Sequence, residues 1–208
     1  MADSHHLSLL LVISAPSGGG KTTLCEQLEE HNPNTIRAIT CTTRPPREGE
    51  KDGVDYYFLD ANTFLKRVQA GNFLEHATVY GNSYGTLKSE VLGKLRHKKD
   101  VLLSIDVQGA ATIRDRAEED HELKRAFISI FLAPPSLAVL EERLKKRGKD
   151  SPNAIQKRLS VARHEIAQAK HFDYVIMSSS VSADLVRMQS IITAEKMRQL
   201  RTVLPDYG

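Results

Sequence analysis

Residues 15–22 carry the clearest chemical signal in the chain, because three glycines there lead into a lysine and a threonine. The segment consists of Ala15, Pro16, Ser17, Gly18, Gly19, Gly20, Lys21 and Thr22. Consecutive glycines let several backbone N–H groups face one anion, and a helix that begins at the loop adds unpaired donors. In such a loop the lysine contacts the β- and γ-phosphates and the threonine hydroxyl ligates Mg²⁺. We therefore expect a nucleoside triphosphate to bind here.

One residue departs from this pattern, because Ala15 stands where the first glycine is expected. Alanine fits that position only if its backbone φ is negative. The alternative interpretation is an ordinary glycine-rich turn between a strand and a helix, but such a turn would not need Gly20-Lys21-Thr22.

A second unusual stretch, residues 40–50, holds Arg44 and Arg47 on either side of two prolines. Guanidinium groups match phosphate oxygens in paired, charge-assisted hydrogen bonds. Tyr56 and Tyr84 follow, and their hydroxyls can donate to the same phosphate. The alternative is a solvated loop with two ordinary core aromatics.

The composition limits the classes of partner. The chain has 208 residues and a net charge of +3 from 29 basic and 26 acidic side chains, which is too balanced for a general nucleic-acid binder. Cys25 and Cys41 lack the spacing of a metal or redox motif. Residues 1–6 carry Asp3 and no lysine or arginine, unlike a secretion signal, and no apolar run is long enough to span a membrane. We expect a cytoplasmic protein with no nucleic-acid or membrane partner. The sequence does not decide whether the chain forms a homo-oligomer.

Short apolar segments alternate with amphipathic ones along the chain, which predicts an α/β fold with a parallel, helix-covered sheet. The predicted core strands are residues 9–13, 35–41, 101–105, 126–132 and 174–177. The predicted helices cover 22–30, start near 110, start at 137 after a Ser136 cap, restart at Pro152 after a Ser151 cap, and cover 183–201.

Two regions interrupt this alternation, and we expect them to be additions to a core formed by residues 1–41, 100–136 and 171–208. Residues 42–99 are predicted as an inserted, mixed α+β subdomain. It should contain a strand at 54–59, a short helix capped by Asp60 with Phe64, Leu65 and Val68 on one face, a strand at 73–80 and a turn at 81–82. Residues 137–170, a basic helical hairpin, are predicted to form a lid.

Seven motifs in this order resemble those of the guanylate kinase family, which transfers phosphate from ATP to GMP. They are Ala-Pro-Ser-Gly-Gly-Gly-Lys-Thr at 15–22, Thr-Thr-Arg-Pro-Pro-Arg-Glu-Gly-Glu at 42–50, Gly-Val-Asp-Tyr-Tyr-Phe at 53–58, Phe-Leu-Glu at 73–75, Gly-Asn-Ser-Tyr-Gly-Thr at 81–86, Ile-Asp-Val-Gln-Gly at 105–109 and Pro-Pro-Ser at 134–136. The resemblance covers nearly the whole chain.

The resemblance implies a role for each matching residue. It places ATP on residues 15–22 and the GMP phosphate among Arg44, Arg47, Tyr56 and Tyr84. It implies that Thr40, Glu75 and Thr86 read the base and that Asp106 lies near Mg²⁺ and the nucleotides, as a metal ligand directly or through water. The alternative for Asp106 is a residue that caps a helix. It further implies that Arg143, Arg147 and Arg158 close over the ATP.

These implied roles suit the chemistry of guanine. An ionised Glu75 only accepts hydrogen bonds. Guanine offers it N1–H and the 2-amino group in one plane, while hydroxyls at Thr40 and Thr86 can donate to O6. Adenine would instead place a bare N1 lone pair near the carboxylate, so the site should reject it strongly.

The expected reaction is direct, in-line phosphoryl transfer from ATP to GMP with Mg²⁺ as cofactor, in which Lys21, Arg44, Arg143, Arg147 and Arg158 are the catalytic residues. The acceptor phosphate is already an anion, so no general base is expected. One alternative is a related binding module without activity, which would lose Lys21, Thr22 and the lid arginines. A kinase for a sugar phosphate would not need a base-reading carboxylate, and a GTPase would need an Asn-Lys-x-Asp-like segment.

Overall fold

The computed structural model describes residues 7–79, 81–148 and 151–204. The expectations for residues 1–6, for Tyr80 at the end of a predicted strand and for residues 149–150 lie outside the described residues, as does the side chain of Arg147.

The predicted five-stranded parallel sheet is confirmed, with strand order β2-β7-β1-β8-β9. Its strands are β2 (Thr35–Arg37), β7 (Asp100–Ser104), β1 (Leu10–Ser14), β8 (Phe127–Ala133) and β9 (Tyr174–Met177). Every residue of β1 is buried, as expected for a central strand covered on both faces.

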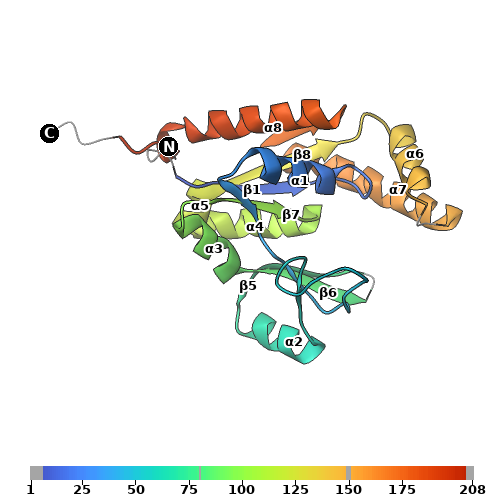
Figure 1. Ribbon diagram of the computed structural model, residues 1–208, viewed down its shortest axis with the longest axis horizontal. Coiled ribbons are helices and arrows are strands. Elements are labelled where there is room, and N and C mark those ends of the chain that lie inside the picture. The colour runs from blue at the N-terminus through green and yellow to red at the C-terminus, as the bar shows by residue number, and fades with distance from the viewer. Residues whose placement is uncertain (1–6, 80, 149–150, 205–208) are drawn as a thin grey trace.

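Helices cover both faces of this sheet, as alternate residues of β1 show. Leu11 and Ile13 pack with α1 (Lys21–His31) and α8 (Val181–Lys196) on one face. Leu10 and Val12 pack with α3 (Lys88–Arg96), α4 (Val107–Glu119) and α5 (His121–Ala126) on the other. Figure 1 shows α8 above the sheet and α4 below it.

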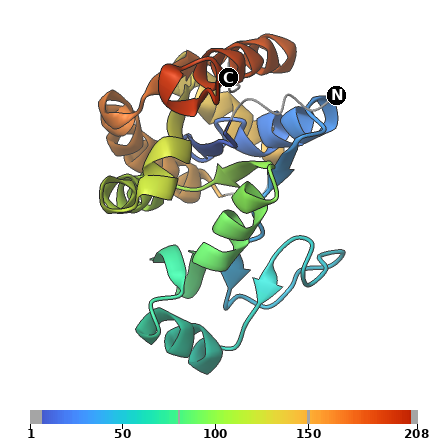
Figure 2. The ribbon, with the colours of Figure 1, turned by 90° about the vertical axis from the view of Figure 1, so that its left-hand side faces the viewer.

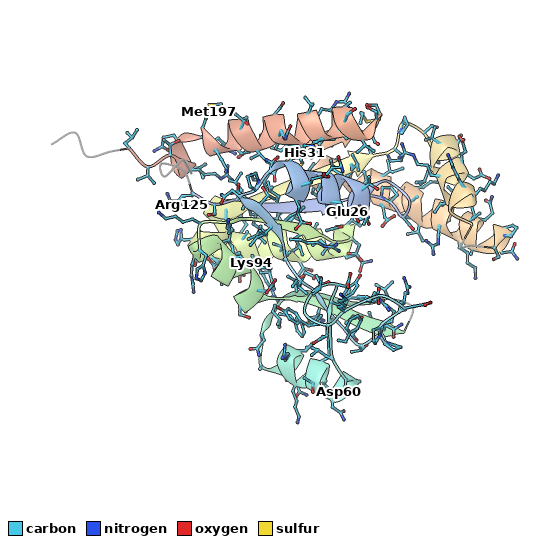
Figure 3. All side chains as sticks on the ribbon, viewed as in Figure 1. Glu26, His31, Asp60, Lys94, Arg125 and Met197 are labelled. Atoms are coloured by element: carbon cyan, nitrogen blue, oxygen red, sulfur yellow. The ribbon has the colours of Figure 1, made fainter. Side chains whose placement is uncertain are left out.

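The insert forms a separate four-stranded mixed sheet, with strand order β4-β3-β6-β5. Its elements are β3 (Cys41–Thr42), β4 (Tyr57–Phe58), α2 (Ala61–Gln69), β5 (Phe73–Val79) and β6 (Asn82–Leu87). Phe64 of α2 stacks on Phe73 of β5 with ring centroids 4.5 Å apart. The insert extends away from the core in both ribbon views (Figures 1 and 2), and Asp60 caps α2 at its far end (Figure 3).

The predicted helical hairpin is present as α6 (Leu137–Arg147) and α7 (Pro152–Ala167), followed by the 3-10 turn η1 (Gln168–His171). Both predicted caps are confirmed: Ser136 accepts from Val139 N–H and Ser151 from Ala154 N–H. The pair has its own apolar cluster, formed by Leu140, Leu144, Ile155, Leu159 and Ala162. A second 3-10 turn, η2 (Gln199–Arg201), follows α8.

Two predicted strands are shorter than expected. The segment 35–41 divides between two sheets, because the chain leaves the core after Ala38 bonds to Leu102 and enters the insert at Cys41. In the segment 54–59 only Tyr57 and Phe58 form a strand. There the carboxylates of Asp52 and Asp55 accept backbone N–H groups and hold a local turn instead.

The helices also differ from expectation in detail. Helix α4 begins at Val107, three residues early, because Asp106 caps it by accepting from Gly109 N–H. Helix α8 begins at Val181 after a Ser180 cap and ends at Lys196. Leu65 does not share the buried face of Phe64, since 54% of it is exposed. Strand β6 and helices α3 and α5 have no counterpart among the predicted elements.

Within the described residues, none of the helices combines the length and apolar character needed to cross a membrane.

Candidate active site

The glycine-rich loop joins β1 to α1 at the carboxyl edge of the core sheet, where parallel α/β sheets commonly bind ligands. Gly18 and Gly20 have φ of 84° and 97°, which a side chain would rarely adopt. Ala15 has the negative φ that its side chain requires, because among the described residues Lys98 is the only one other than glycine with a positive φ. The loop therefore keeps its strained positions for glycine.

Lys21 opens α1 and turns back over the loop, where its ammonium group donates to the carbonyl oxygen of Ala15. Burial lowers the pKa of Lys21, while the nearby carboxylates of Glu165 and Asp106 raise it. Thr22, the next residue, is exposed. A cation and a free hydroxyl thus stand at the same helix N-terminus.

A cavity of about 760 Å³ surrounds this loop. Its lining includes residues 16–24 and two basic side chains of α6, Arg143 and Lys146. It also includes Ser178, Ser179, Val181 and Asp184, which follow strand β9. Sequence reasoning missed this last segment, although the carboxyl end of a parallel strand at the same sheet edge was an available signal.

A second cavity, of about 280 Å³, lies between the insert and the core sheet. Five residues predicted for the acceptor line it: Thr40, Tyr56, Glu75, Tyr84 and Asp106. Tyr56 and Tyr84 meet edge to face with centroids 6.3 Å apart. The structure thus brings together side chains from five separate segments of the chain.

Glu75 is the buried carboxylate of this second cavity, with 6% of the residue exposed. Burial raises the pKa of Glu75, the Thr86 hydroxyl lowers it, and the charge of Asp106 raises it further. Thr86 donates to Glu75 Oε1 over 2.7 Å. The hydroxyl that was expected to face a base is therefore directed at the carboxylate, and it fixes the orientation of Glu75.

Arg44 and Arg47 lie on the loop beside this cavity. Arg44 donates from both terminal nitrogens to Glu50, with each distance 2.9 Å, and its guanidinium lies 5.4 Å from the centre of the Tyr56 ring. The backbone N–H of Arg47 also donates to Glu50, and the Arg47 side chain is exposed. Both terminal nitrogens of Arg44 are thus engaged by Glu50.

The hairpin α6–α7 contacts the glycine-rich loop directly. Arg158 of α7 donates to Ser17 Oγ over 2.7 Å. A Cβ on Gly18 would approach the side chain of Leu144 in α6 to 3.0 Å. Arg143 lines the loop cavity, while the side chain of Arg147 is outside the described part.

A third cavity, of about 660 Å³, borders both the loop cavity and the insert cavity. It shares Ser17 with the loop cavity and Asp106 with the insert cavity, and Arg158 and Glu165 also line it. Sequence reasoning missed Glu165, a carboxyl whose pKa is raised by burial and lowered by Lys21. The arrangement offers room for two ligands that would meet beside Arg158, Asp106 and Glu165.

Comparison with known proteins gives consistent matches. A family model described as guanylate kinase matches residues 8–195. A guanylate kinase from Carboxydothermus hydrogenoformans is 41% identical over 94% of this chain and 93% of its own length. One from Coxiella burnetii is 44% identical over 91% of this chain and 89% of its own. The crystal structure of guanylate kinase from Anaplasma phagocytophilum, 32% identical, superposes with a TM-score of 0.75 and covers 95% of this chain and 91% of that one.

Proposed function

Because this chain belongs to the guanylate kinase family, we propose that it transfers the γ-phosphoryl group of ATP to GMP, giving ADP and GDP. The observation that carries the proposal is the pair of cavities bordered by a common third one, with Lys21 lining the first and Glu75 the second. A kinase for two nucleotides needs this two-ended arrangement, whereas a binding module without activity needs only one end.

The proposed division of labour follows the three parts of the fold. The core, residues 1–41, 100–136 and 171–208, would bind ATP on residues 15–22. The insert, residues 42–99, would bind GMP, and the lid, residues 137–170, would close over both. The Arg158–Ser17 contact supports this role for the lid, since it already links α7 to the phosphate-binding loop.

Guanine would be read by Glu75, whose free acceptor sites face N1–H and the 2-amino group. Thr86 supports this reading by holding Glu75 over 2.7 Å. Thr40 lines the cavity that contains Glu75 and would donate to O6. The GMP phosphate would lie among Arg44, Arg47, Tyr56 and Tyr84. These two cations and two phenols suit a dianionic monoester.

Transfer would be direct and in line, without a covalent enzyme intermediate, and no general base is needed because the acceptor oxygen is already an anion. Catalysis then consists of alignment and charge neutralisation. Lys21, Arg44, Arg143, Arg147 and Arg158 would neutralise the charge that spreads over the transferring group. Closure of α6–α7 would exclude water and so limit hydrolysis of ATP. We place this reaction in the cytoplasm.

The residues present fit a magnesium ion delivered with ATP. Mg²⁺ retains several waters and takes few protein ligands beside the substrate phosphates. Thr22 offers an exposed hydroxyl at the loop, and Asp106 lines the connecting cavity while one of its oxygens caps α4. When bound, the ion would neutralise phosphate charge; Thr22 and Asp106, the latter directly or through water, would hold it.

A coupled assay of ADP formation tests the proposed substrate. With ATP and Mg²⁺, GMP should be turned over at least about 10³-fold more efficiently than AMP, UMP or CMP, because only guanine pairs a buried acceptor with adjacent N–H donors. Comparable rates with AMP would contradict the assignment of Glu75, and hydrolysis of ATP without any acceptor preference would contradict the proposed reaction.

The substitution Arg44→Lys should raise KM for GMP about tenfold, because lysine cannot form the planar, paired contacts that Arg44 now makes with Glu50. KM for ATP is the internal control and should not change, since Arg44 lies on the insert. Steady-state kinetics with each substrate varied in turn measures both values. An equal rise in both KM values would assign Arg44 a structural role only.

A further inference from the structure

Three consecutive residues of β5, Phe73, Leu74 and Glu75, are all buried, although neighbouring residues of a regular strand point to opposite faces. Each of the three serves a different region. Phe73 belongs to the apolar cluster of the insert, Leu74 to the cluster beneath the core sheet, and Glu75 lines the insert cavity. Regular strand geometry cannot produce this distribution.

The pairing of β5 with β6 explains it, because the register shifts by one residue at this point. Phe73 pairs with Leu87, whereas Glu75 pairs with Thr86, so Leu74 is an extra residue. Such a bulge bends the strand and redirects side chains. Without the shift, Glu75 would share the face of Phe73 and point into the apolar cluster. The bulge is therefore what directs Glu75 toward the cavity and Thr86.

Arg116 of α4 contacts the backbone of β5 at this bulge. Its Nη1 donates to the carbonyl oxygen of Leu74 over 2.5 Å and also to that of Phe73. These two carbonyls immediately precede Glu75. A side chain of the core thus holds the irregular backbone of the insert, and its charge also lowers the pKa of Glu75.

Two glycines make room for the same arrangement. A Cβ on Gly85 would lie 2.9 Å from Glu75 O and from Phe73 Cδ1, so β6 approaches the bulge closely because it has glycine there. A Cβ on Gly109, at the start of α4, would lie 3.0 Å from Glu75 Oε2. The carboxylate is thus enclosed by α4 on one side and by β6 on the other.

We propose that Arg116 is a positioning residue for substrate specificity, because it holds the β5 bulge that presents Glu75 to the purine of the acceptor nucleotide. The inference rests on the proposed function, in which Glu75 reads guanine. Arg116 does not line the acceptor cavity. Its effect would reach the base through Glu75, by way of the backbone of residues 73–75 and of its charge near the carboxylate, so it should change the recognition of the base more than the binding of ATP.

The test compares Arg116→Met and Arg116→Lys with the wild-type protein. GMP and IMP serve as acceptors, because IMP has N1–H but lacks the 2-amino group. We expect kcat/KM for GMP to fall about tenfold in R116M, as for the loss of a charged hydrogen bond. The fall for IMP should be smaller, so the GMP/IMP ratio decreases, and KM for ATP stays constant. R116K retains a cationic donor and should recover part of the ratio.

The matched control is Arg96→Met, which removes an exposed arginine that pairs with Glu122 away from β5. Its GMP/IMP ratio should equal that of the wild type. An unchanged ratio in R116M, or an equal loss toward GMP, IMP and ATP, would overturn the inference. If R116M does not fold, Arg116→Gln, which loses the charge and the reach to both carbonyl oxygens, takes its place, and an unchanged GMP/IMP ratio in folded R116Q would overturn the inference. A wild-type enzyme without any preference for GMP over IMP would instead contradict the proposed reading of guanine.

Discussion

Replacing Lys21 by alanine should reduce kcat by about 10³-fold, because loss of one preorganised charge-stabilising group typically costs 10²–10³ and we propose that Lys21 serves both nucleotide binding and transfer. In the structure its ammonium group donates to Ala15 and lies under the influence of Glu165. Those contacts would be exchanged for phosphate oxygens. Single-turnover measurement of GDP formation at saturating ATP and GMP checks this expectation directly.

The control for this substitution is the acceptor site, which Lys21 does not line. Equilibrium binding of GMP, measured by calorimetry, should remain within about twofold of wild type in K21A, since sites without shared contacts behave nearly independently. Lys21→Met keeps the apolar stem and separates packing from charge. Turnover above a tenth of the wild-type rate in either variant would contradict a role of Lys21 in the transfer.

Replacing Glu75 by glutamine should lower kcat/KM for GMP about 100-fold, because the amide places a donor where guanine also presents donors and charged hydrogen bonds contribute about 1.5–3 kcal/mol. In E75Q the amide oxygen would remain the acceptor for the Thr86 hydroxyl, and the amide NH₂ group would then face the base. KM for ATP should not change. Initial rates with GMP and AMP in parallel measure the loss of discrimination, and a GMP rate near wild type would refute the base-reading role.

The same substitution should preserve or raise thermal stability at neutral pH. Burial raises the folded-state pKa of Glu75, so the folded protein binds the proton more tightly than the unfolded chain. Stability from this group is therefore present at low pH and is lost as the pH rises through the raised pKa. Glutamine is neutral, so E75Q avoids the cost of burying the negative charge of Glu75. Thermal unfolding of E75Q and wild type across pH 4–8 should show a difference that grows with pH; a difference that shrinks would contradict the buried-charge account.

Short-range patterns were sufficient for much of the fold. The strands of the core sheet were recognisable as apolar runs, and helix starts at Asp60, Ser136 and Ser151 were visible from one capping residue each. The glycine-rich loop could also be recognised from the sequence, because its glycines and Lys21 all lie in one short segment between a strand and a helix. The predicted segment 35–41 failed for the opposite reason: pattern alone did not show that its two ends join different sheets.

The side-chain contacts around the insert cavity could not be predicted from the spacing of the motifs. The motifs identified Arg44, Tyr56, Glu75 and Tyr84, but not the pairing of Arg44 with Glu50 or of Thr86 with Glu75. Both pairings use atoms that a ligand was expected to occupy. They arise because buried or closely packed polar groups must find partners when the chain folds, whatever they contact later.

By itself, then, the sequence determined which residue types stand at the two nucleotide ends and which local elements carry them, since caps, glycine turns and apolar periodicity act over a few residues. Only the tertiary structure decided that Ser178–Asp184 borders the phosphate-binding loop, that Glu165 faces Lys21, and that Arg116 holds the bulge before Glu75. Those contacts join segments more than 40 residues apart. They depend on strand order, register and helix placement, which are set by burial of the whole core rather than by neighbouring residues.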